Sequence, residues 1–114
     1  MTRSYARQIA LDYVKAMEAR AGLEFVLLDE QTIEREFGWV FFYQSEDYVL
    51  FKRDSARLFG NAPIIVNRRT GRATLTDTSF PIDDLIAAYE ALGVERFELG
   101  EWRTYLRHKV PPLD

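Results

Sequence analysis

The side chains in this sequence that could take part in a reaction are carboxylates and one histidine. The chain has 114 residues, with 18 Asp and Glu residues, one histidine and no cysteine. Without cysteine there is no disulfide, no thiolate metal site and no cysteine nucleophile. His108 lies between Arg107 and Lys109, and no carboxylate or nucleophile is close to it in the sequence. Because acid–base and nucleophilic catalysis both need such a partner, we interpret His108 as structural or solvent-exposed.

The densest acidic group consists of Asp29, Glu30, Glu34 and Glu36. Its spacing differs from that of a calcium-binding loop. Two carboxylates suffice for glycoside hydrolysis, but that reaction needs a substrate cleft, for which a chain of this length has little room. The glycines are isolated and lack the spacing of a phosphate-binding loop. We therefore predict a protein that is not an enzyme and that binds no metal or cofactor.

The same acidic group is a candidate for partner binding. In a strand, alternate side chains share a face, which would place Thr32, Glu34 and Glu36 together, with Asp29 and Glu30 just before them. Such a face fits a basic partner and accelerates encounter with it. It equally fits a solvated surface that keeps the strand polar, and the residues alone leave both interpretations open.

Two further features have a structural and a functional interpretation. Trp39 follows a glycine at the start of an aromatic strand, and it suits either the core or a partly exposed contact at the edge of the acidic face. The run Gly60-Asn61-Ala62-Pro63 has the composition of a turn. We predict a structural role for Gly60, Asn61 and Pro63, with the Asn61 side chain bonding to nearby backbone.

The elements that must position these residues follow from hydrophobic periodicity. Apolar residues recur at helical spacing from Thr2 to Arg20, and Gly22 would stop that helix. Strands are predicted at 23–28, 32–37, 39–44, 64–66 and 72–76, with a hairpin loop at 67–71 between the last two. The aromatic strand at 39–44 should be central in the sheet. A broken helix is predicted at 45–59, a helix at 82–92 and a further short element within 94–109. Consecutive strands favour antiparallel pairing. We predict one α+β domain over residues 1–114, with a small antiparallel sheet packed by an N-terminal helix and C-terminal helices.

Composition excludes several kinds of partner. The net charge is −3 and the sequence pI is about 5.2, which argues against general nucleic-acid binding. The apolar runs are too short to span a bilayer, and the N-terminus lacks the apolar segment of a signal peptide. We expect a cytoplasmic protein that does not bind nucleic acid or membrane and that is a monomer or a weak homodimer.

Several of these motifs together resemble a known family. They are the stretches 37–45 and 58–67, followed by Gly71, Phe80-Pro81-Ile82 and Tyr89-Glu90. In these motifs the chain is similar to the immunity protein 35 family, also described as YrhB-domain proteins. The resemblance extends to about Leu92, so residues 1–92 would form a family-like core and residues 93–114 a C-terminal extension.

The resemblance implies a small α+β protein encoded beside a bacterial polymorphic toxin. Such a protein would protect the producing cell by binding the toxin stoichiometrically, and the acidic face predicts a toxin with a basic surface. A related branch of the family implies an alternative, a chaperone-like protein that binds unfolded or client proteins. The family carries no established catalytic residues, so none transfers to this chain.

Overall fold

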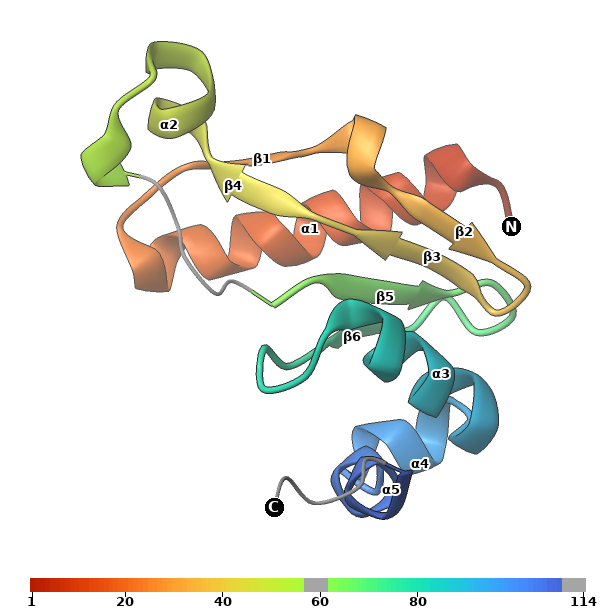
Figure 1. The fold of residues 1–114 in the computed structure, drawn as a ribbon. Coiled ribbons are helices and arrows are strands. Elements are labelled where there is room, and N and C mark those ends of the chain that lie inside the picture. Colours follow the sequence, from red (N-terminus) through yellow and green to blue (C-terminus); the bar gives the residue numbers. More distant parts are fainter. Residues whose placement is uncertain (57–61, 110–114) are drawn as a thin grey trace, which may run out of the picture. The chain divides into compact units, whose positions relative to one another are not determined.

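The computed structural model describes residues 1–56 and 62–109, which divide into two compact units within 1–76 and 77–114 (Figure 1). The first unit contains α1 (Arg3–Ala21), β1 (Phe25–Leu27), the 3₁₀ helix η1 (Asp29–Gln31), β2 (Ile33–Arg35), β3 (Gly38–Phe41), β4 (Tyr43–Ser45), α2 (Glu46–Phe51), η2 (Asp54–Ala56), β5 (Ile64–Asn67) and β6 (Ala73–Leu75). The second contains α3 (Ile82–Leu92), α4 (Val94–Glu98) and α5 (Trp102–Lys109). An N-terminal helix, antiparallel sheets and C-terminal helices confirm the predicted α+β class.

Helix α1 forms where its periodicity predicted it. The Thr2 side chain accepts a hydrogen bond from the Tyr5 N–H, and Gly22 ends the helix in the left-handed region, at φ 69°. Its buried side chains recur every four residues and are small, so the helix axis comes close to the strands that it covers; they are Ala6, Ala10 and Val14. Along one face of the strands, α1 contacts β1, β3, β5 and β6 (Figure 1).

The strands form a four-stranded antiparallel sheet, in the order β2-β3-β5-β6, and a separate β1-β4 pair. The run 39–44, predicted as one strand, is divided at Phe42. Between the pairs Leu27↔Tyr43 and Ile33↔Val40, residues 28–32 on one side face only residues 41 and 42 on the other. The additional residues on the first side form η1. Because the two sides differ in length, the β1–β4 and β2–β3 ladders are both interrupted between these two pairs.

Strand β3 is the central strand that its aromatic composition predicted, with all four residues buried. Side chains from one face of the strands and from α1 together form the hydrophobic core. The core consists of Ala6, Ala10, Val14, Phe25, Leu27, Trp39, Phe41, Tyr43, Ile64 and Val66. Val40 and Ile65 lie opposite each other in the β3–β5 ladder, and their side chains are on the other face of the sheet. Both are also fully buried. Both faces of the β3–β5 ladder are therefore apolar and buried.

Two turn predictions have different outcomes. The hairpin loop over 67–71 is confirmed, because the Asn67 side-chain oxygen accepts from the N–H groups of Arg69 and Thr70, each at 3.0 Å, and Gly71 has φ 73°. Of the turn predicted at 60–63, Gly60 and Asn61 lie outside the described residues. The Pro63 carbonyl accepts from the N–H and the hydroxyl of Thr76, at 2.9 and 2.7 Å.

The second unit is built around a row of aromatic side chains. Tyr89 of α3 meets Phe97 of α4 edge-on, with ring centroids 5.2 Å apart, and Phe97 stacks on Trp102 of α5 at 6.0 Å. Phe80 meets the same indole edge-on at 5.9 Å. His108 is exposed on α5, in agreement with the interpretation from the sequence.

Gly38 offers a direct test of the β3–β5 contact. It has φ 147°, and a Cβ there would lie 2.0 Å from the Val66 carbonyl oxygen. Gly38→Ala should therefore lower the free energy of unfolding by at least about 3 kcal/mol, because both the backbone conformation and a backbone atom of β5 oppose the methyl group.

Gly22→Ala is the matched control. Gly22 also has positive φ, at 69°, but a Cβ there meets nothing within 4 Å. It should cost only the left-handed conformation, about 1–2 kcal/mol. Urea denaturation of both variants measures the difference, and equal losses would contradict the close approach of β3 to β5.

Candidate functional site

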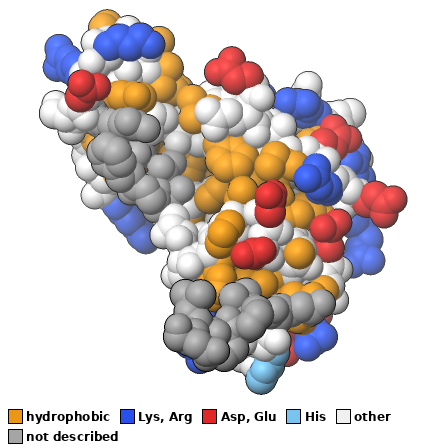
Figure 2. All heavy atoms as spheres, viewed as in Figure 1, with side chains coloured by type: hydrophobic (Ala, Val, Ile, Leu, Met, Phe, Trp, Pro, Cys, Tyr) orange, Lys and Arg blue, Asp and Glu red, His pale blue; other side chains and the backbone are white. Residues whose placement is uncertain are grey.

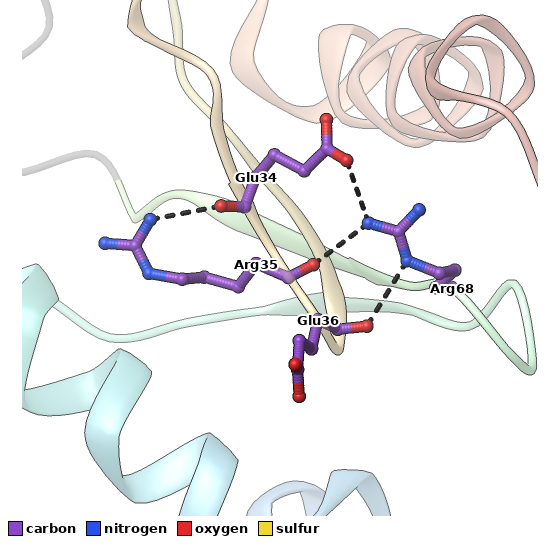
Figure 3. Close-up of polar contacts among 4 residues, drawn as sticks. All are labelled: Glu34, Arg35, Glu36 and Arg68. Atoms are coloured by element: carbon purple, nitrogen blue, oxygen red, sulfur yellow. Dashed lines mark hydrogen bonds and ion pairs between the residues drawn. The ribbon is translucent and has the colours of Figure 1, made fainter.

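The candidate site is the tip of the β2–β3 hairpin, where the sequence predicted a partner surface. A shallow surface hollow of about 600 Å³ lies there, lined by Glu34, Arg35, Glu36 and Arg68. The strand predicted over 32–37 is shorter than expected: β2 comprises only Ile33–Arg35, and Glu36 and Phe37 form the turn. Alternation therefore does not extend to Glu36, and Figure 3 shows its carboxylate directed away from Arg68, toward which Glu34 points.

Arg68, the residue after β5, holds the hairpin turn through both its backbone and its side chain. Its N–H donates to the Phe37 carbonyl at 2.7 Å. Its guanidinium donates to the carbonyls of Glu36 and Arg35 and to the Glu34 carboxylate, at 3.2, 3.0 and 3.0 Å (Figure 3). One side chain thus connects three consecutive residues at the end of β2 and in the turn.

The Trp39 indole ring packs against the Arg68 guanidinium. The carbon atom at the centre of the Arg68 guanidinium lies 4.3 Å from the indole ring centroid, in cation–π geometry. The Trp39 side chain is only 1% exposed, so the alternative of an exposed contact at the edge of the acidic face is not what the structure has. Trp39 belongs to the core, and its ring face contacts the Arg68 guanidinium.

The register places Glu34 directly opposite Trp39, on the same face of the hairpin. The hydrogen bond from Arg68, and after it an interaction with the Trp39 indole, lowers the pKa of the Glu34 carboxyl. The buried indole N–H nevertheless has no acceptor of good hydrogen-bond geometry among the described residues. The indole thus favours the ionised form of the Glu34 carboxyl without forming a full hydrogen bond to it.

Asp29 is also paired, with arginines of α1. The Arg7 guanidinium donates hydrogen bonds from Nε to the Asp29 Oδ1 at 2.7 Å and from Nη2 to Oδ2 at 3.0 Å. The two residues thus form a bidentate ion pair. This hydrogen bonding lowers the pKa of the Asp29 carboxyl and raises the pKa of Arg7. Arg3 donates to the Asp29 carbonyl at 3.3 Å. Asp29 is therefore a contact between η1 and the start of α1 and not a free anion.

The expected acidic face is consequently a surface of mixed charge. Asp29 and Glu34 are paired with arginines, whereas Glu30 and Glu36 are exposed and form no ion pair with any residue that the structure describes. Thr32 is half-buried where η1 ends. Figure 2 shows basic and acidic side chains interspersed at the right-hand side, where Figure 1 draws the hairpin. The neutralising arginines come from 22 and 34 residues away in the sequence, so the local pattern did not reveal them.

The paired carboxylates have lowered pKa values and are weak bases at neutral pH. Within residues 1–56 and 62–109, no three His, Asp or Glu side chains are grouped as a metal site would require. No helix in these two ranges is both long enough and apolar enough to cross a bilayer.

Arg68→Met tests whether this arginine holds the hairpin. The variant loses three side-chain hydrogen bonds to backbone and carboxylate groups and the contact with Trp39. We expect the free energy of unfolding at pH 7 to fall by about 1–2 kcal/mol. Arg69→Met is the control, since the exposed neighbouring side chain has no ion pair with any described residue; a loss as large as that of Arg68→Met would contradict this assignment.

The same pair predicts a pH dependence. Because the folded-state pKa of Glu34 is lowered, its contribution is present above the ordinary glutamate pKa and is lost as the pH falls through the lowered value. The difference in unfolding free energy between the parent and Arg68→Met should therefore shrink on acidification. A difference that grows toward acid pH would contradict the pairing.

Comparison with known proteins agrees with the sequence resemblance. The family model described as Immunity protein 35 matches residues 5–92, well over half of the chain. A protein of Escherichia coli (strain K12), described as uncharacterized protein YrhB, is 30% identical over 53 residues; this stretch covers 46% of the chain and 56% of the relative. The chain thus spans about half the length of that relative, and no solved structure matches it significantly. The chain belongs to the immunity protein 35 family.

Proposed function

We propose that this protein is an immunity protein that binds and neutralises a cognate bacterial toxin by stoichiometric protein–protein contact. The observation that carries this proposal is the family match over residues 5–92. We further propose that it acts in the cytoplasm of the producing cell, as a monomer or weak homodimer, without catalysis and without a cofactor.

The geometry of the hairpin supports a binding role. Arg68 fixes the turn, so the exposed charges of Arg35 and Glu36 stand on a backbone that is already ordered. A partner that binds there need not bear the entropy cost of ordering the loop. We propose that the surface formed by Asp29, Glu30, Thr32, Glu34 and Glu36 is part of the interface with a toxin that carries basic groups, and that Trp39 contributes only indirectly, by supporting Arg68.

A chaperone-like role is the second candidate. Leu50 and Phe51 of α2 are 57% and 64% exposed, and exposed apolar side chains of this kind fit unfolded segments of client proteins. This alternative predicts weak binding to many unfolded chains, whereas immunity predicts a defined complex with one folded toxin.

Co-expression distinguishes the two functions. The probe is the C-terminal domain of the polymorphic toxin encoded beside the gene for this chain. We expect that domain to arrest growth of a bacterial host, this protein to restore growth, and size-exclusion chromatography with light scattering to find a complex of fixed stoichiometry. A non-cognate toxin domain is the control and should remain toxic.

Three outcomes contradict the proposal. One is a gene neighbourhood without such a toxin. Another is growth arrest that persists although this protein is well expressed. The third is suppression of aggregation of unrelated unfolded proteins without any complex with the toxin domain, which would favour the chaperone-like alternative.

A charge series tests the hairpin surface itself. Glu30→Lys with Glu36→Lys should leave the melting temperature nearly unchanged, because neither carboxylate forms an ion pair within the described part of the chain. The association rate with the toxin domain at low salt should fall by about threefold or more. Glu30→Gln with Glu36→Gln should give an intermediate rate. Equal rates for all three proteins would show that the hairpin lies outside the interface.

A further inference from the structure

Helix α2 is a short helix that buries none of its six residues. The Ser45 hydroxyl accepts from the Tyr48 N–H at 3.1 Å and begins the helix. Lys52 and Arg53 donate their N–H groups to the Tyr48 and Asp47 carbonyls and end it. Both termini are therefore satisfied by hydrogen bonds, and the helix is a defined element although it contributes no buried side chain to the core.

The last turn of α2 presents Leu50 and Phe51, which with Tyr5 are the most exposed large apolar side chains among the described residues of the first unit. Their exposed fractions are 57% and 64%, and they are consecutive in the sequence. In the part of Figure 2 where Figure 1 draws α2, hydrophobic side chains reach the surface beside acidic and basic ones. Adjacent exposed Leu and Phe side chains on an ordered helix form a small apolar surface that a protein partner can cover.

Three carboxylates lie in the first turn of α2 or beside it, and none of them forms an ion pair within the described part of the chain. The Glu46 N–H donates to the Glu24 carbonyl at 2.8 Å, which brings the first turn of α2 next to the residue that precedes β1. Among the described residues, Glu24, Glu46 and Asp47 form no ion pair. The nearby Lys15 already pairs with Glu18, at 3.5 Å. These carboxylates thus differ from Asp29 and Glu34 at the hairpin, which arginines of the same chain neutralise.

The crowding of like charges affects the pKa of Glu46. The hydrogen bond shared with Glu24, then partial loss of hydration and repulsion from Glu24 and Asp47, raises the pKa of the Glu46 carboxyl, and Lys15 only partly opposes this. A cation placed beside these carboxylates would relieve the repulsion. Around α2 the carboxylates of Glu24, Glu46, Asp47 and Asp54 outnumber the cations of Lys52 and Arg53, so the site has a net electrostatic preference for a basic partner.

We infer that α2 is the principal contact with the toxin: Leu50 and Phe51 enter an apolar depression on its surface, and Glu24, Glu46 and Asp47 face its lysine or arginine side chains. This inference rests on the proposed immunity function and names the surface that performs it. The proposed immunity function favours the toxin as the occupant. A second copy of this chain is the competing occupant, because an antiparallel two-fold contact would place Lys52 and Arg53 of one copy beside the acidic first turn of the other. An anionic membrane surface is disfavoured because the acidic residues around α2 outnumber the basic ones.

The apolar part is tested with Leu50→Ala combined with Phe51→Ala, using the toxin domain named above as the probe. We expect the dissociation constant to rise by at least about 30-fold, mainly through faster dissociation, with the melting temperature nearly unchanged. Leu99→Ala is the matched control, since Leu99 is 79% exposed on the other unit, and it should change the dissociation constant by no more than about twofold.

The charged part is tested with Glu46→Gln combined with Asp47→Asn. We expect binding about tenfold weaker and less dependent on salt. Asp83→Asn with Asp84→Asn is the matched control, because it removes two carboxylates from the first turn of another helix, α3, and it should leave binding unchanged. Calorimetry in two buffers, at a pH low enough for part of Glu46 to be protonated, should detect proton release when the parent binds, and this release should disappear with Glu46→Gln.

The outcomes separate this inference from the function on which it rests. If the toxin domain does not bind the parent chain, the immunity function fails and this inference fails with it. If the parent binds and protects while the α2 variants bind as well as the parent, the function stands and α2 is not the interface. Loss of a parent homodimer in the Leu50/Phe51 variant, with toxin binding intact, would identify a second copy as the occupant and overturn the inference.

Discussion

The close approach of Gly38 to the carbonyl of Val66 is the contact on which the first unit depends. Only a residue without Cβ fits there, because a Cβ would come within 2.0 Å of that oxygen. The approach lets β3 pair with β5 from Gly38 to Phe41, which places Trp39 in the core opposite Glu34. It also brings Arg68, at the end of β5, over the indole and onto the hairpin turn. The shape of the candidate surface is thus a consequence of one tight backbone contact.

Local sequence patterns predicted what depends on local physics. The helix over 2–20, the central aromatic strand and the Asn67–Gly71 loop follow from apolar periodicity, capping and turn chemistry, which act within a few residues. The division of the strand at Phe42 was not predictable in the same way. It depends on the number of residues in the opposing segment, which matters only after the two segments have paired.

The charge of the candidate site was misjudged for a related reason. Asp29, Glu30, Glu34 and Glu36 are adjacent in the sequence and looked like one acidic face, but Arg7 and Arg68 neutralise two of them from distant segments. Trp39 was left open between core and surface because alternation alone does not say which face is covered. For α2 the sequence predicted only a broken helix over 45–59, and it is the structure that shows Leu50 and Phe51 to be exposed.

The two surfaces of the first unit suit different parts of a binding process. The hairpin is ordered and largely self-neutralised, so its remaining exposed charges would act on the rate and selectivity of encounter. Helix α2 has exposed apolar side chains and carboxylates that form no ion pair within the described part of the chain. A partner that covers the helix would remove this exposure and relieve the repulsion between the carboxylates. This division assigns most of the affinity to α2 and part of the specificity to the hairpin.

Hydrogen–deuterium exchange of the free protein and of its complex with the cognate toxin domain tests this account most directly. The account predicts that complex formation slows exchange most strongly in residues 46–53 and more weakly in residues 34–38. Unchanged exchange in residues 46–53, in a complex that is otherwise saturated, would contradict it.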